Sequence, residues 1–344
     1  MKNSLFLLGA AAVVALSSCS QSEVMEVAEN RAIGFNAFVN NNTRAITELT
    51  KTNLIKFNVF GYHGTNTPDY TNTLVTGSGI TNEWTISGAA YWQKDNAYEF
   101  AAYSDGNNSL ANENVSFAEK KLTISNYTVS TNDLIAAQTS VASQNDITKY
   151  VDVNLNFYHL LSQVKFTFSN SDSRDYIMKI SDLTITANKT GKVVFTMNDG
   201  TSPSITWSDA TTGTYTITGL ADIAEGDLNA PRSTESILVM PQENDALTVS
   251  FKVTLSDKNG ESGKIAEGDF TAPLDIDAEA QNSAWQPGYR YNYTATINGD
   301  QVPDIDDPDK KPIKIEFTVT KEIDGWENAE ADPTTPSVVV TPEP

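Results

Sequence analysis

The stretch Leu247-Thr-Val-Ser-Phe-Lys-Val-Thr-Leu255 sets the pattern from which the fold can be predicted. Its odd-numbered residues are all apolar and its even-numbered residues are all polar. Because successive side chains of a β-strand point to opposite faces, this alternation is typical of a strand with one buried face. The stretch therefore predicts a sheet whose apolar face is covered by another layer.

The same alternation recurs along the chain. Apolar residues at every second position predict further strands at 55–59, 153–157, 164–168, 183–187, 289–297 and 313–319. Turn clusters such as Asp105-Gly-Asn-Asn108 separate them. Helical periodicity is almost absent, and the bend from Tyr158 to Ser162 is the best short helical candidate. Many short antiparallel strands with one apolar face each predict an all-β fold of sandwiches.

A length of 344 residues favours two domains. We place the boundary near His159, which predicts an N-terminal β-sandwich at 45–158 and a C-terminal one at 159–327. Residues 299–312 are rich in aspartate and proline, so we expect an exposed loop before the last strand. Residues 328–344 form a Pro-rich tail that we expect to be extended.

The first residues predict export. Residues 1–18 have the layout of a signal peptide, with Lys2 before an apolar run that is too short to span a bilayer. Leu16-Ser-Ser-Cys19 resembles the bacterial lipobox, whose cysteine is acylated and becomes the first mature residue. Cys19 is the only cysteine, so it cannot form an internal disulfide. Acyl chains such as palmitate on Cys19 would hold the protein to the outer membrane; the alternative is a stray thiol in a discarded signal.

Composition excludes several classes of function. The net charge of -21 and the pI near 4.4 oppose binding to a nucleic-acid backbone, and no basic stripe is present. Only two histidines occur, His63 and His159, and neither has a neighbouring metal-ligand pair, so a His-rich zinc site is excluded and no cofactor is implied. We interpret His159, flanked by apolar residues, as a hydrogen-bonded packing residue.

Other candidate sites have a simpler interpretation. Gly260-Glu-Ser-Gly-Lys264 lacks the full spacing of a phosphate loop and is read as a hairpin turn. Four aspartates at 304, 306, 307 and 309 could hold calcium, but they lack the glycine and terminal glutamate of an EF-hand, so a solvated loop is favoured. Tryptophans at 84, 92, 207, 285 and 326 could stack on sugars, although packing is their commoner role.

Catalysis is not indicated by any motif. The 44 acidic residues offer many pairs for glycosidase-type chemistry, but abundance alone does not show which of them meet in space. We therefore expect that the protein is not an enzyme.

Several segments together resemble the Bacteroidetes fimbrillin family of lipoprotein pilins. Their order and spacing carry the resemblance more than any one motif. They are the lipobox, Ile33-Gly-Phe-Asn-Ala-Phe-Val39 with Thr43-Arg-Ala45, Phe57-Asn-Val-Phe-Gly-Tyr62, Tyr91-Trp92 with Tyr98-Glu-Phe-Ala-Ala-Tyr103, Asp133-Leu-Ile-Ala-Ala137, Leu155-Asn-Phe-Tyr-His-Leu-Leu-Ser162 and Trp285-Gln-Pro-Gly-Tyr289. The resemblance implies two tandem transthyretin-like antiparallel β-sandwich domains and a structural role in a surface fimbria that supports adhesion.

The resemblance also implies a way of assembly. In stalk members a trypsin-like protease cuts after an arginine near the start, and an extended segment of another pilin subunit replaces the first strand. Here residues 19–44 hold the tether and that strand, Arg44 is the expected cut site, and Arg31 is the alternative. The apolar residues of the removable strand are Ile33, Phe35, Ala37 and Val39. The candidate donor is Val338, Val339 and Val340, which is short and flanked by prolines.

Two other functions stay open at this point. One is a non-polymerising surface lipoprotein that binds a glycan or a host ligand through its loops. The other is an anchor subunit that keeps its lipid and ends the filament at the membrane. Arg44 and the C-terminal extension favour the stalk role, whereas the weak donor sequence favours the other two.

Overall fold

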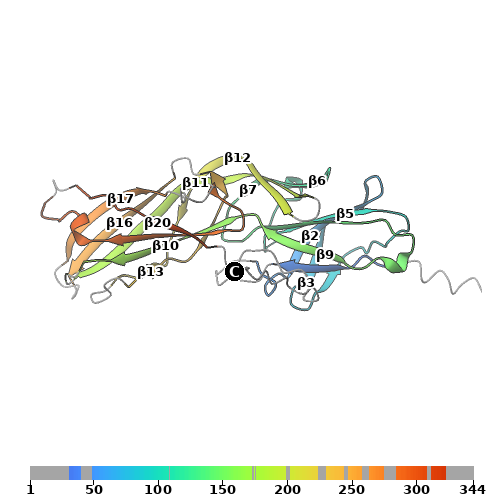
Figure 1. Ribbon diagram of the computed structural model, residues 1–344, viewed down its shortest axis with the longest axis horizontal. Helices are drawn as coiled ribbons and strands as arrows, with labels where there is room; N and C mark the ends of the chain where they lie inside the picture. The colour runs from blue at the N-terminus through green and yellow to red at the C-terminus, as the bar shows by residue number, and fades with distance from the viewer. Residues whose placement is uncertain are drawn as a thin grey trace, which may run out of the picture.

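The computed structural model of the chain describes residues 31–39, 49–107, 109–172, 174, 176–198, 202–223, 230–243, 247–257, 263–274, 284–307 and 311–322. These residues form an elongated, nearly all-β molecule (Figure 1), which confirms the all-β prediction; the two tandem transthyretin-like domains stay a prediction. Its helices are three short 3-10 turns, η1 (Asn112–Asn114), η2 (Ile147–Lys149) and η3 (Gly299–Gln301). In the part of the chain described, no helix has the length and apolarity needed to cross a membrane.

A seven-stranded sheet forms one end of the molecule, with the strand order β1-β9-β8-β5-β2-β3-β4. All neighbours are antiparallel except β1 and β9, which are parallel. The strands are β1 (Phe35–Val39), β2 (Lys56–His63), β3 (Thr67–Ser78), β4 (Glu83–Ile86), β5 (Tyr98–Ser104), β8 (Ile135–Val141) and β9 (Val153–His159). Their inward-facing aromatic and aliphatic side chains form a core of their own.

Two further sheets pack face to face in the rest of the molecule. One has the order β17-β16-β11-β7-β6 with β12 paired to β11, and the other has the order β13-β10-β19-β20 with β14 paired to β10. Rings from the two layers meet where Phe251 lies 5.5 Å from Phe168, between centroids. The strands are β6 (Val115–Ala118), β7 (Lys121–Thr128), β10 (Ser162–Asn170), β11 (Tyr176–Asn198), β12 (Ser202–Thr216), β13 (Arg232–Ser233), β14 (Ile237–Val239), β16 (Thr248–Asp257), β17 (Lys264–Pro273), β19 (Arg290–Ile297) and β20 (Thr318–Glu322). A small separate ladder joins β15 (Gln242–Glu243) to β18 (Ala284–Trp285).

The two ends of the molecule share hydrogen-bonded structure. The boundary expected near His159 coincides with the short link between β9 and β10, where Leu160 and Leu161 are fully buried. However, β7, which precedes this link in sequence, pairs with the second half of the long β11, which follows it. The link is therefore not the only connection between the ends, and the division into domains at 158/159 stays a prediction.

Two expectations about local structure were wrong. The bend from Tyr158 to Ser162 is not helical, because β9 continues to His159 and β10 begins at Ser162. The amide of Leu160 bonds to the carbonyl of Leu134 on a neighbouring segment instead of closing a helical turn. The strand expected at 313–319 begins only at Thr318, since the amide of Ile313 bonds to Gln301 in η3 and not to a sheet.

The loop expected before that last strand is largely exposed. Asp304, Asp306 and Asp307 are solvent-exposed, while Asp304 forms a β-bridge with Ala266 and Val302 is buried in the core. Residue 309, the fourth aspartate of the calcium alternative, lies outside the described residues. Within the described residues no group of three metal-ligating side chains gathers.

Candidate functional site: the first strand and its groove

The strand β1 buries one face completely. Ile33, Phe35, Ala37 and Val39 are at most 5% exposed, while the residues between them are partly exposed. The strand runs parallel to β9, with Phe35 opposite Val153 and the register continuing to the end of β1. The structure thus forms the strand expected from the sequence and buries all four of its predicted inward residues. At about 1.5 to 3 kcal/mol for each large buried side chain, this burial holds β1 in place.

Phe35 enters a pocket of aromatic rings. Its ring centroid lies 6.3 Å from that of Phe57, 5.7 Å from Tyr70 and 5.9 Å from Phe100. Gly61 on β2 makes this arrangement possible, because a Cβ atom there would lie 2.8 Å from the Phe100 ring and 3.0 Å from the Tyr70 ring. We call these three rings, with Gly61 behind them, the aromatic socket.

The two edges of β1 are held differently. One edge forms a regular ladder with β9. On the other edge the amide of Ala37 donates to the side-chain oxygen of Asn82, 3.2 Å away, in the turn between β3 and β4. A strand with a ladder on only one edge separates from its sheet more easily than a central strand does. β1 is therefore held by a full ladder on one edge only.

Arg31 is built into the structure just before β1. Its carbonyl accepts a hydrogen bond from the amide of Trp92 at 2.9 Å, and its guanidinium donates to the carbonyl of Tyr150. The next residue, Ala32, forms a β-bridge with Tyr91. A protease must bind its substrate as an unpaired extended chain, so these contacts protect the peptide bond after Arg31. Arg31 as the alternative cut site stays a prediction from the sequence.

Three of the predicted sites lie outside the described residues. These are Cys19, Arg44 and the donor candidate Val338 to Val340. Their roles in lipidation, processing and strand donation remain predictions from the sequence.

A buried polar pair, His159 and Asp133, binds the chain at Leu49, just after residues 40–48. The Nδ1 atom of His159 lies 2.6 Å from Oδ2 of Asp133, and both side chains are almost inaccessible to solvent. Asp133 also accepts hydrogen bonds from the amides of Leu49, at 3.2 Å, and Leu134, at 2.8 Å. The prediction that His159 is a hydrogen-bonded packing residue is confirmed. Sequence analysis did not foresee its partner, although Asp133 begins one of the quoted motifs.

The tryptophans mostly serve packing. Trp92 and Trp285 are at most 2% exposed, and Trp84 and Trp207 are partly buried. The Trp92 ring stacks on Tyr150 with 4.5 Å between centroids, close to the start of β1. The packing interpretation is therefore confirmed for these four residues, whereas Trp326 lies outside the described part of the chain.

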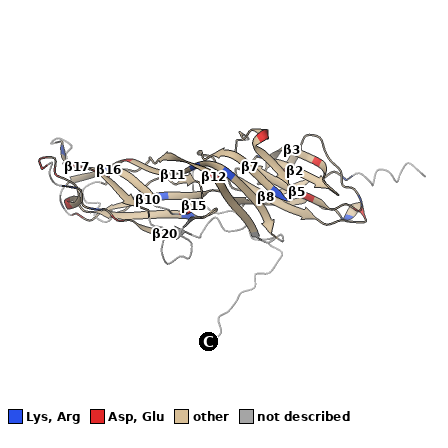
Figure 2. Cartoon of the chain, turned by 90° about the horizontal axis from the view of Figure 1, so that it is seen from above, with Lys and Arg blue, Asp and Glu red and all other residues tan. Residues whose placement is uncertain are grey.

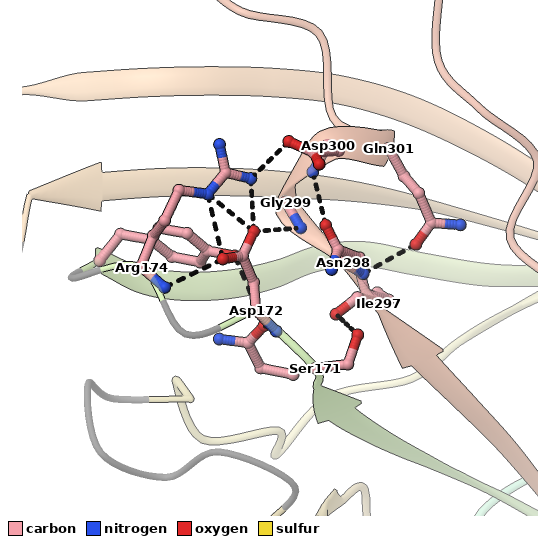
Figure 3. A network of polar contacts seen from close by, with 10 residues as sticks. Ser171, Asp172, Arg174, Ile297, Asn298, Gly299, Asp300 and Gln301 are labelled. Carbon is pink, nitrogen blue, oxygen red and sulfur yellow. Dashed lines mark hydrogen bonds and ion pairs between the residues drawn. The ribbon is translucent and has the colours of Figure 1, made fainter.

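A second polar network closes the far tip of the molecule, where β10 and β19 end (Figure 3). The guanidinium of Arg174 contacts the carboxylates of Asp172 and Asp300, and the amide of Gly299 donates to Asp172 at 3.1 Å. The Arg174 guanidinium holds the pKa of Asp172 well below its usual range. A Cβ atom on Gly299 would lie 2.7 Å from the Asp172 carboxylate, so a larger residue there would have to displace the side chains of this network. This network fastens η3 to the β10–β11 connection.

Charged side chains do not define another site on the described strands. In the view of Figure 2, lysines and arginines (blue) and acidic residues (red) are scattered along the described strands and loops, with no large cluster of one sign.

The structure is that of an elongated all-β protein in which the edge strand β1 buries one face in an apolar groove. The sequence profile of the fimbrillin-like family matches residues 43–326, and the chain belongs to that family. No curated protein matches the sequence. The membership confirms the resemblance inferred from the motifs.

Solved structures show the same fold. A fimbrial protein from Bacteroides vulgatus ATCC 8482 superposes with a TM-score of 0.58 at 15% identity, covering 87% of this chain and 100% of that one. A candidate cell adhesion protein from Bacteroides eggerthii DSM 20697 gives a TM-score of 0.51 at 14% identity, covering 86% and 97%. The match therefore extends over both ends of the molecule.

Proposed function

We propose that this chain is a structural subunit of a cell-surface fimbria that supports adhesion, and that it is not an enzyme. Membership of the fimbrillin-like family supports a fimbrial or adhesive role. The observation that carries the proposal is β1: an edge strand, buried on one face, that directly precedes the segment containing the predicted processing site.

The assembly route follows from this strand. The protein is exported as a lipoprotein acylated at Cys19 and reaches the outer membrane. A trypsin-like protease then cuts after Arg44, which severs the lipidated end and β1 from the rest of the chain. Loss of β1 uncovers the edge of β9 and an apolar groove, and an extended segment of another subunit fills both by strand addition. Because each subunit accepts at one place and donates from another, the contact is head-to-tail and continues as a filament.

The contacts around the cut support its placement at Arg44. A cut there leaves β1 bound only by non-covalent contacts, whereas the bond after Arg31 is protected by the bridge to Tyr91. Downstream of the cut, the carboxylate of Asp133 holds the amide of Leu49. The chain thus stays held at Leu49 while β1 is free to leave.

Limited trypsin treatment of protein that begins at Ser20 tests this proposal, with intact mass and native gels as readouts. We expect a cut after Arg44 and, once the trypsin is inhibited, replacement of β1 by an added excess of a synthetic strand with the sequence of residues 31–39; the Arg44→Ala variant should show neither. The Arg31→Ala variant is the matched control and should behave as wild type. A protein that resists cleavage, or that is cut and takes up no strand, would contradict the stalk role and favour an anchor subunit or a ligand-binding surface lipoprotein.

A further inference from the structure

The groove that β1 occupies is not uniformly apolar. It receives side chains of different size at the inward positions of the strand, among them a ring at Phe35 and a single methyl group at Ala37, both buried. Side chains at these positions decide which strands can replace β1, since specificity in strand addition comes from the pockets for alternate side chains.

The aromatic socket is shaped for a ring. Phe57 and Phe100 meet Phe35 edge-on, at interplanar angles of 83° and 87°. Such edge-to-face contacts are favourable beyond simple area burial and are lost when an aliphatic side chain takes the place of the ring. The rings of Phe100 and Tyr70 already lie close to the β2 backbone at Gly61. They therefore have little room to move and fill the space that a missing Phe35 ring would leave. An unfilled socket would therefore leave a cavity.

The Ala37 position excludes large side chains. Ala37 is fully buried, and it lies opposite Leu155, which is also fully buried. The strand cannot move outward to make room, since the ladder to β9 holds one edge and Asn82 binds the Ala37 amide on the other. Added methyl groups at such a site force neighbouring side chains out of their preferred conformations.

We propose that the groove is an acceptor selective for an extended strand of a different kind of subunit. That strand carries an aromatic residue at the position of Phe35 and alanine or glycine two residues later, at the position of Ala37. This inference rests on the proposed strand exchange and specifies the partner that takes part in it.

The chain's own candidate donor does not meet this requirement. The segment Val338-Val-Val340 has no aromatic residue, and in an alternating strand it presents valines two positions apart. One valine would leave the socket half-empty and the other would crowd the Ala37 position. Proline at 336 and 342 also removes two ladder donors from the flanks. A strand from another subunit type, with a ring followed by a small residue, fits both positions.

The test uses protein that begins at Ser20, cut once in the 40–48 segment so that β1 is retained non-covalently. The cut protein is unfolded and refolded with an equimolar mixture of two synthetic strands, and native mass spectrometry shows which one is bound. One strand in each mixture has the sequence of residues 31–39. Its competitors carry Phe35→Leu, Ala37→Val or, as the matched outward-facing control, Phe38→Leu; a fourth competitor has the sequence of residues 334–342.

We expect the Phe35→Leu and Ala37→Val strands to lose the competition by about tenfold or more, and the 334–342 strand to lose at least as strongly. The Phe38→Leu strand should compete about equally, because its changed side chain faces outward. Equal binding of all strands, or preference for the 334–342 strand, would overturn the selectivity while leaving strand exchange intact. Failure of the 31–39 strand itself to bind would instead refute the proposed function.

Discussion

Replacing Phe35 with alanine tests how β1 is held. The Phe35 ring is buried and contacts three other rings, so its removal leaves a cavity lined by Phe57, Tyr70 and Phe100. Deletions of buried phenylalanine cost about 3–5 kcal/mol. Because β1 has a ladder on one edge only, we expect this loss to release β1 before the rest of the sheet unfolds.

Phe38 provides a matched control on the same strand. It lies on the outward, partly exposed face of β1, so Phe38→Ala removes the same atoms without opening the core and should cost about 1 kcal/mol or less. Urea unfolding followed by circular dichroism gives the global free energy of unfolding, and hydrogen exchange of residues 31–39 gives the opening of β1. We expect fast exchange in that segment only for Phe35→Ala. Equal losses in the two variants would refute the idea that the inward face of β1 holds it.

Three further predictions concern other parts of the structure. His159→Ala leaves the buried carboxylate of Asp133 without its main partner, and we expect the free energy of unfolding to fall by about 3 kcal/mol in urea titrations; a loss under about 1 kcal/mol would contradict the pairing. Burial raises the pKa of Tyr98 to about 12, so a neutral phenol is favoured in the fold and stability should decrease as pH rises from about 10 to 12, parallel to phenolate absorbance. The pKa of Asp172 is lowered by Arg174, so the tip network should be fully formed above about pH 4 and weaken only in stronger acid; in Arg174→Ala, hydrogen exchange in η3 should already be fast at neutral pH.

The strands were the most predictable part of the fold. Strict alternation at 247–255 and 289–297 corresponds closely to β16 and β19, because a half-buried strand needs no more than its own sequence to show which face is inward. The same alternation at 313–319 predicted a ladder that begins only at Thr318, although Ile315 is buried and the Phe317 ring packs on the core. Apolar spacing predicts burial, whereas pairing depends on which neighbouring edge is free.

Contacts between distant segments were not predictable. Nothing in the sequence around 121–128 indicates that β7 joins β11 across the expected domain boundary. The inward residues of β1 followed from their spacing, but the socket that receives Phe35 did not, because its rings come from three different strands. In the sequence, Gly61 is only one residue of a quoted motif. The structure shows its role, which is to leave room for the rings of Phe100 and Tyr70.

A reversible covalent lock on β1 tests the central claim most directly. Asn36 on β1 and Asn154 on β9 are register partners whose exposed side chains are 3.1 Å apart. Neighbouring strands lie about 4.7–4.9 Å apart, within the range that a disulfide spans. Cysteines at both positions, in protein that begins at Ser20 and so lacks Cys19, should form a disulfide that ties β1 to its groove.

The measurement is the uptake of an excess of a synthetic strand with the sequence of residues 31–39 after trypsin treatment, with the lock oxidised and with it reduced. The account predicts that the oxidised protein is cut after Arg44 but keeps β1 and takes up no strand, and that reduction restores uptake; the single Asn36→Cys variant should take up the strand in both states. Equal uptake by the oxidised and reduced double variant would show that β1 need not leave its groove, and would contradict the account.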